Sequence, residues 1–199
     1  DNLKQDNANL EILLGFSGGL DSCVLLHLLS QMQTQFDFKL KAIHIHHGLS
    51  SSADDWLNFC KEKCKLLDIE FYDIKVKINK KSSLGIEGEA RELRYEAIKK
   101  KQKGIVALGH HQNDQAETLM LQLLRGSGLK GLAGMPEFDE KRKFWRPMLN
   151  IKKELLEKYA SENNIKYIKD ESNEDINFDR NFIRNKVLPL IESRYPSSV

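Results

Sequence analysis

The chain has few cysteines and no long apolar run. It contains three cysteines in 199 residues, and its first residues, Asp-Asn-Leu-Lys-Gln, are polar and lack the pattern of a signal peptide. We therefore expect reduced thiols in a cytoplasmic protein rather than a disulfide framework. The longest apolar stretch is too short to cross a bilayer, so we expect no membrane association.

Charge of a single sign is not in excess, because 31 basic and 29 acidic residues leave a net charge of +2. This balance neither requires nor excludes a nucleic-acid partner, so the distribution of charge must decide. Between residues 125 and 153, eight Lys or Arg residues stand against three acids, which makes this segment locally basic. The length of the chain is sufficient for one core with a small appendage.

Residues 11–29 combine the features of a phosphate-binding turn. An apolar run suited to a buried strand leads into Ser-Gly-Gly-Leu-Asp-Ser at 17–22, and a helix with one apolar stripe follows. The backbone N–H groups of such a turn and the helix dipole favour an anion. A Cβ at Gly19 would either crowd the phosphates or strain a turn with φ > 0.

The side chains of the turn indicate which class of phosphate-binding loop it can form. No lysine follows the glycines, which excludes the nucleotide loop ending in Gly-Lys-Ser/Thr. Ser17 and Ser22 offer hydroxyl donors. Asp21 places a carboxylate where phosphate would repel it, which indicates Mg²⁺ or a cationic substrate group nearby. A serine- and glycine-rich turn with an ordinary helix cap is the alternative interpretation.

Strands alternate with helices over the first 124 residues. Strands are expected over 12–16, 40–46, 69–76 and 105–109, and helices over 20–32, 53–67, 86–101 and 113–124. The alternation predicts an α/β fold, a doubly wound parallel sheet with helices on both faces. We expect the core sheet within about 10–150 and a small, mostly helical C-terminal extension over about 151–199. Polar segments at 17–22, 46–51 and 110–118 follow strands and should meet at the carboxyl edge.

Asp114 has two interpretations. Asp114 and Glu117 could form a capping box, with Asp114 as the N-cap of a helix. Alternatively, Asp114 is a catalytic carboxylate on the helical face that it shares with Thr118. The local sequence leaves both open.

Histidines, arginines and cysteines elsewhere also carry two interpretations. The histidines at 44, 46, 110 and 111 could bind a transition metal, but hydrogen bonding at strand ends is favoured. Arg91 and Arg94 form either a solvated surface or a pair of guanidinium groups aimed at phosphate or a nucleobase. Cys60 and Cys64 share a helical face, and two small buried side chains are favoured over a redox or iron–sulfur pair.

The Ser-Gly-Gly-x-Asp-Ser turn resembles the signature of the PP-loop ATP-pyrophosphatases, with all five fixed positions present. Other segments resemble the tRNA(Ile)-lysidine synthetase family, in order over about residues 12–190. They are 43–49, 88–95, 114–118, 124–132, 146–149, 170–173 and 179–184. Asn113 departs from the family pattern, in which an acid is common, so Asp114 is the acid expected to function. The family usually has further C-terminal tRNA-binding domains, so we expect an isolated catalytic domain or a truncated chain.

This resemblance implies an ATP-dependent ligase that joins free L-lysine to C2 of the wobble cytidine of tRNA(Ile) with a CAU anticodon. The reaction would pass through an adenylated cytidine and release AMP and diphosphate. The alternatives are a PP-loop tRNA thiolase, a small-molecule amide synthetase, or a nucleotide-sensing module without turnover. A homodimer is one hypothesis for its assembly.

The resemblance also implies roles for particular residues. Catalysis is expected from Asp21, Arg91 and Asp114, with Mg²⁺ held by Asp21. The residues expected to bind ATP are Ser17, Gly18, Gly19, Leu20, Asp21, Ser22, His44, His46 and His110. The residues expected to bind tRNA are Arg94, Arg125, Lys130, Arg146, Arg180 and Arg184.

Overall fold

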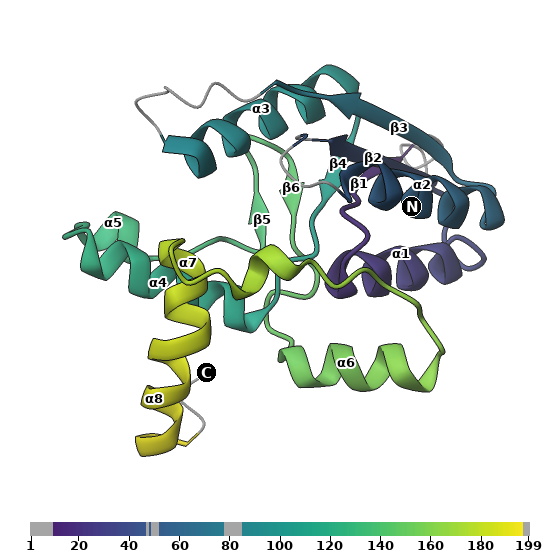
Figure 1. Cartoon of the computed structure of the whole chain (residues 1–199). Helices are drawn as coiled ribbons and strands as arrows, with labels where there is room; N and C mark the ends of the chain where they lie inside the picture. Colours follow the sequence, from purple (N-terminus) through teal and green to yellow (C-terminus); the bar gives the residue numbers. More distant parts are fainter. Residues whose placement is uncertain (1–9, 47, 49–51, 78–84, 197–199) are drawn as a thin grey trace, which may run out of the picture.

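A six-stranded sheet forms the centre of the molecule (Figure 1). The computed structural model describes residues 10–46, 48, 52–77 and 85–196. The strand order is β3-β2-β1-β4-β6-β5, and all neighbours are parallel except β5 and β6. The strands are β1 (Glu11–Gly15), β2 (Lys39–His46), β3 (Glu70–Lys75), β4 (Ile105–Ala107), β5 (Phe138–Asp139) and β6 (Phe144–Trp145).

Helices follow the first four strands at nearly the expected positions. They are α1 (Leu20–Met32), α2 (Ala53–Leu66), α3 (Gly85–Lys101) and α4 (Gln112–Leu124), and the short α5 (Leu129–Leu132) follows. The predicted α/β fold with a mostly parallel sheet and helices on both faces is confirmed. The antiparallel strand β5 and its partner β6 were not predicted, because two-residue strands show no periodicity in a sequence.

Both faces of the sheet are covered by apolar side chains. On one face, α1 and α2 pack on the strands and α6 (Lys153–Glu162) packs against α1, and the core includes Phe16, Val24 and Leu156. On the other face, Ile98 of α3 packs against Leu13 and Val106. Figure 1 shows α3 on one side of the sheet and α1 with α6 on the other.

The three cysteines belong to the core. Cys23 is 2% exposed. Cys60 and Cys64 are fully buried, which agrees with their interpretation as two small buried side chains. Burial raises the pKa of the Cys23 and Cys64 thiols to about 12 and that of Cys60 higher still, so these groups stay protonated at neutral pH.

The segment after residue 150 consists of short helical pieces that return to the sheet. Besides α6 they are the 3₁₀ turn η1 (Glu171–Glu174), α7 (Asp179–Phe182), the π-helical turn η2 (Ile183–Val187) and α8 (Leu188–Arg194). Tyr159 of α6 hydrogen-bonds His27 of α1 at 3.1 Å. The N–H of Ile168 donates to the carbonyl of Gly18 at 2.9 Å, which ties this segment to the glycine turn.

The order of the strands reverses between β1 and β4. The chain runs outward from β1 through β2 to β3 and then returns to the other side of β1 with β4. In open α/β sheets, ligands bind at the carboxyl ends of the strands where the order reverses in this way. The glycine turn follows β1 and the His110 segment follows β4, so both lie at this point.

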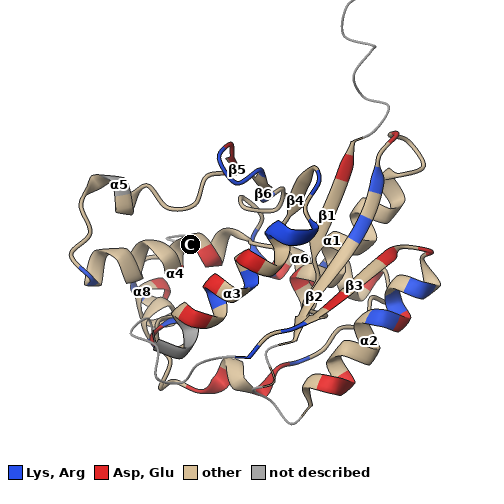
Figure 2. Ribbon diagram, turned by 90° about the horizontal axis from the view of Figure 1, so that it is seen from above, with Lys and Arg blue, Asp and Glu red and all other residues tan. Residues whose placement is uncertain are grey.

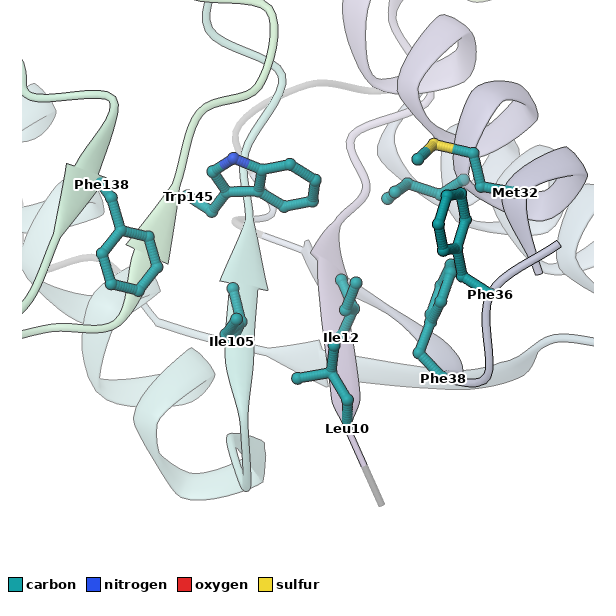
Figure 3. A pocket seen from close by; sticks show the side chains of 9 residues that line it. Leu10, Ile12, Met32, Phe36, Phe38, Ile105, Phe138 and Trp145 are labelled. Carbon is teal, nitrogen blue, oxygen red and sulfur yellow. The ribbon is translucent and has the colours of Figure 1, made fainter. Parts of the chain in front are cut away.

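An apolar pocket lies at the opposite, amino edge of the sheet. It has a volume of about 310 Å³, and Figure 3 shows its lining. The lining residues are Leu10, Ile12, Leu29, Met32, Phe36, Phe38, Ile105, Phe138 and Trp145. Within the described part of the chain, no helix combines the length and the apolar character needed to cross a membrane.

Candidate active site at the carboxyl edge of the sheet

The glycine turn is ordered by its own serines. Ser22 is buried, and its hydroxyl accepts from the N–H of Gly18 at 3.1 Å and donates to the carbonyl of Gly19 at 3.1 Å. Ser17 lies 3.1 Å from the Ser22 hydroxyl and accepts from the N–H of Gly19 at 3.3 Å. Hydroxyl and amide donors therefore gather at the N-terminus of α1, where the helix dipole also favours an anion.

The two glycines of the turn have different physical reasons to be glycine. Gly18 has φ +86°, and a Cβ there would lie 2.7 Å from Ile168 Cδ1 and 2.9 Å from Cys60 Sγ. Gly19 has φ −72°, and its Cβ would meet only the Ser17 hydroxyl, at 3.5 Å. Of the two reasons expected for Gly19, a positive φ is therefore wrong, because the left-handed residue is Gly18. Close approach of an anion stays a prediction for Gly19.

This difference gives a matched pair of variants. Gly18→Ala should lower the melting temperature by about 4–8 °C, because a left-handed alanine and the clash together cost about 2 kcal/mol. Gly19→Ala should keep the melting temperature but weaken ATP binding about tenfold, because the methyl group stands where a phosphate would approach. Calorimetric ATP titration and thermal melts of both variants test this. Wild-type ATP affinity in a folded Gly19→Ala protein would contradict it.

The segment that follows β4 brings His111 beside Asp21. A Cβ on Gly109 would lie 3.1 Å from the carbonyl carbon of Asp21, so the chain passes very close to the start of α1. His111 is buried, and its Nε2 lies 3.6 Å from Asp21 Oδ1 and 3.6 Å from Asp114 Oδ2. The segments after β1 and β4 thus meet, as their positions at strand ends predicted.

The cap of α4 differs from the expectation. His111, with extended backbone dihedrals, is the N-cap, and Asp114 is the third helical residue. The Asp114 carboxylate accepts from the N–H of His111 at 2.9 Å, so the capping box joins His111 with Asp114 and not Asp114 with Glu117. Asn113 holds a different segment, because its side-chain oxygen accepts from the N–H of Lys153 at 3.2 Å.

Asp21 and Asp114 have pKa values shifted in opposite directions. Burial raises the pKa of Asp21 above its ordinary value, although His111 acts in the other direction. Burial would also raise the pKa of Asp114, but His111, Arg180 and the hydrogen bond from the His111 backbone outweigh it, so the pKa is lowered. Neighbouring carboxylates with pKa values pushed apart are typical of sites that need a charged group and a proton acceptor.

Glu117 was expected only as a capping partner of Asp114, and the structure places it in the candidate site. It is fully buried, and its carboxylate receives Arg180 Nε at 2.6 Å, Arg184 Nε at 2.6 Å and Arg184 Nη2 at 2.9 Å. Arg180 Nη2 also donates to Asp114 Oδ1 at 2.9 Å. The three-residue spacing from Asp114 was the signal that could have found Glu117. Arg180 and Arg184, expected to hold tRNA, both point at these two acids.

A group of basic side chains lies around His110. Arg91 is exposed and donates from Nε to the Tyr95 hydroxyl at 3.1 Å, and Arg94 is also exposed. Arg146 is buried beside them. Burial is the main cause of a pKa of about 4 for His110, and the charges of Arg146 and Arg180 lower it further. His110 is therefore neutral at neutral pH.

The remaining residues that were expected to bind ATP or tRNA lie on either side of this centre. His44 donates from a ring nitrogen to the Phe16 carbonyl at 2.9 Å, and burial lowers its pKa. His46 Nε2 lies 3.2 Å from Asp54 Oδ1. Leu20 belongs to the core, so only its backbone can face a nucleotide. Arg125 is exposed at 3.5 Å from Asp179, and the side chain of Lys130 lies outside the described residues.

Charges are interspersed over the rest of the surface. Figure 2 shows acidic and basic residues mixed along α2 and α3, and basic residues at the β5–β6 turn. Part of the basic segment is neutralised locally, because Arg142 pairs with Asp139 at 2.9 Å and Lys143 pairs with Glu140 at 2.9 Å.

Asp21 fits a magnesium ion that also contacts phosphates. Its Oδ1 is a buried carboxylate oxygen without a hydrogen-bond partner. Mg²⁺ is commonly bound by one or two carboxylates together with substrate phosphates. No group of three or more His, Cys, Asp or Glu side chains in the described ranges is arranged to hold a metal by itself.

A glycine turn between β1 and α1, at the switch point of a parallel sheet, defines a class of phosphate-binding α/β domains. The chain belongs to the PP-loop family, because the family model described as a PP-loop domain matches residues 1–191. Within that family it is similar to tRNA(Ile)-lysidine synthases. It is 46% identical over 187 residues to that of Actinobacillus pleuropneumoniae serotype 3 (strain JL03), covering 92% of this chain and 43% of the relative.

Two further relatives carry the same name. The chain is 46% identical to tRNA(Ile)-lysidine synthase of Histophilus somni (strain 2336), covering 98% of this chain and 46% of the relative. It is 43% identical to that of Proteus mirabilis (strain HI4320), covering 97% and 45%. The chain therefore spans less than half the length of the curated relatives that it matches.

A solved structure shows the same fold. The U34-tRNA thiolase NcsA from Methanococcus maripaludis, solved with its [4Fe-4S] cluster, superposes with a TM-score of 0.76. The two share 20% sequence identity, and the match covers 96% of this chain and 69% of that one. At this identity the likeness concerns the fold alone.

Proposed function

We propose that this domain catalyses ATP-dependent joining of free L-lysine to C2 of the wobble cytidine of tRNA(Ile) with a CAU anticodon. The C2 oxygen of the cytidine attacks the α-phosphorus of ATP, and diphosphate leaves. The ε-amine of lysine then attacks C2, AMP leaves, and the amine loses a proton. The names and identities of the relatives support this proposal.

One arrangement carries the proposal: two acids and two arginines converge beside the glycine turn. Asp114 and Glu117 meet Arg180 and Arg184, and His111 links Asp114 to Asp21. A free amino acid carries both an ammonium and a carboxylate group. Carboxylates suit the ammonium groups of lysine, and guanidinium groups suit its carboxylate. Such a mixed site suits a zwitterionic amino acid better than a nucleotide alone.

Each residue of the site then has a separate role in the reaction. The backbone N–H groups at the start of α1, with Ser17 and Ser22, bind the β- and γ-phosphates, and Asp21 would hold Mg²⁺, which would neutralise charge there. Asp114, whose pKa is lowered, stays ionised and holds the amine of lysine. Because Asp21 would be engaged with Mg²⁺, Asp114 is also the carboxylate suited to accept the proton that the amine releases. Arg91 stabilises negative charge on the phosphate or the activated base.

Proposed RNA contacts extend outward from this centre. Arg94, Arg125, Lys130 and Arg146 supply positive charge for phosphates of the anticodon arm. A base in an anticodon loop can leave its stack and enter such a pocket. We assign Arg180 and Arg184 first to the amino-acid site, because both already pair with its carboxylates.

The thiolase alternative has less support from the cysteines. A thiolase of this fold would need thiols that reach a substrate or a cluster. Here all three cysteines are buried in the core, and burial raises the pKa of each thiol. We therefore favour ligation of an amine over transfer of sulfur.

Incorporation of radiolabelled lysine into an RNA transcript tests the function. We expect label to enter a tRNA(Ile) transcript with a CAU anticodon only when ATP and Mg²⁺ are present. The control transcript carries uridine in place of the wobble cytidine and should remain unlabelled. Diphosphate release without any RNA would instead indicate a small-molecule synthetase, and an unlabelled CAU transcript would overturn the proposal.

A further inference from the structure

Arg146 is a buried cation without an anion. It is 5% exposed, and among the described residues no carboxylate lies within 4.0 Å of its guanidinium group. Its Nη1 donates to the Pro136 carbonyl at 2.8 Å, but its buried Nε has no hydrogen-bond partner. A buried charge without a partner is costly, so its presence calls for a ligand of opposite charge.

The strands direct Arg146 to the active site. It follows β6 immediately, and β6 runs parallel to β4, with the N–H of Leu108 donating to the Trp145 carbonyl at 2.9 Å. Arg146 and His110 therefore leave the sheet at the same edge. Burial is the main cause of the low pKa of His110, and the charge of Arg146 lowers it further, as expected for two side chains at the same edge.

Arg91 adds a second cation on the same side. Its guanidinium lies 5.6 Å from the centre of the Tyr95 ring, and that ring lies 5.4 Å from the ring of Phe144 in β6. Burial lowers the pKa of Arg146, and the positive charge of Arg91 lowers it further. The charge of Asp139 acts in the other direction, but Asp139 is already bound by Arg142 at 2.9 Å. Two cations held near each other in this way favour an anion between them.

We infer that Arg146, with Arg91, binds a phosphate of the RNA substrate next to the target nucleotide, at a subsite separate from the glycine turn. This assignment rests on the proposed function and makes it more specific. The anion is a phosphodiester and not the triphosphate, because the glycine turn already supplies the donors for the latter. The domain should thus act on a nucleotide held by its own backbone and should use free cytidine poorly.

Single-phosphate neutralisation in an anticodon stem-loop RNA tests the subsite. Each phosphate flanking the wobble cytidine is replaced in turn by an uncharged methylphosphonate. Binding to the wild-type protein, Arg146→Gln and Lys143→Gln is measured by fluorescence anisotropy. Lys143 is the matched control, since it is basic and exposed and its charge is paired with Glu140 at 2.9 Å.

Arg146→Gln should weaken binding of the native RNA about tenfold, and one methylphosphonate should weaken wild-type binding to a similar extent. When Arg146→Gln is tested with the methylphosphonate RNA, the loss of affinity should be no larger than that from either change alone. Lys143→Gln should change binding less than about threefold and keep the full sensitivity to that methylphosphonate. ATP affinity of Arg146→Gln should equal that of the wild type.

Several results would overturn the assignment. If the affinity losses from Arg146→Gln and from the methylphosphonate multiply, Arg146 acts only through the fold. If Arg146→Gln reduces the affinity for ATP, Arg146 binds the triphosphate. If Arg146→Gln does not fold, indifference of the wild type to both methylphosphonates would still refute the subsite. Absence of any RNA binding by the wild type would refute the proposed function together with it.

Discussion

Glu117→Gln should lower both the stability and the activity of the domain. The Glu117 carboxylate is fully buried and receives three charged hydrogen bonds from Arg180 and Arg184. Removing one partner of a buried ion pair costs about 3 kcal/mol or more, because the remaining charges lose their counterion. For a chain of this length, we expect the melting temperature to fall by about 10 °C. Lysine transfer should also become undetectable, because the arginines would no longer be held.

An exposed pair supplies the control for this prediction. Glu157 lies 3.6 Å from Lys153 on the surface of α6, and both side chains are about half exposed. Glu157→Gln should change the melting temperature by no more than about 2 °C, since such pairs contribute little. Thermal melts of the two variants under one set of conditions make the comparison. Equal melting temperatures for Glu117→Gln and wild type would show that the buried ion pair does not stabilise the fold.

The parts that could be predicted from sequence are those that depend on near neighbours. The strand, glycine turn and helix around Ser17 are local, and the alternation of apolar segments fixes the order of elements. Even here local reasoning offered Gly19 as a left-handed position, whereas the left-handed residue is Gly18, where Ile168 and Cys60 from distant segments leave no room for a Cβ. Identifying which glycine has a positive φ therefore required the tertiary structure.

The ion pairs at the site depend on long-range contacts. Arg180 lies 63 residues from Glu117 and Arg184 lies 67, and the segments that carry them share no periodicity. Their basic character therefore predicted RNA contact, whereas the fold turns both toward acids. Burial of Arg146 is equally invisible in sequence, because its position after β6 depends on two-residue strands.

Asp114→Asn should separate capping from catalysis. The variant keeps an oxygen that can accept from the N–H of His111, so the start of α4 should survive. It loses the negative charge that pairs with Arg180 at 2.9 Å, which should cost about 1–2 kcal/mol. Lysine transfer should fall about a hundredfold or more, because the carboxylate that holds the amine is gone. ATP binding should persist, since the phosphate donors lie on the turn after β1.

A second capping aspartate makes the comparison specific. Asp170 accepts from the N–H of Ser172 at 2.9 Å on the surface, and Asp170→Asn should leave both melting temperature and lysine transfer close to wild type. The rate of lysine transfer, the ATP affinity and the melting temperature are measured for both variants. If Asp114→Asn transfers lysine at the wild-type rate, Asp114 serves only the helix and the arginine, and the amine of lysine must be held by another carboxylate.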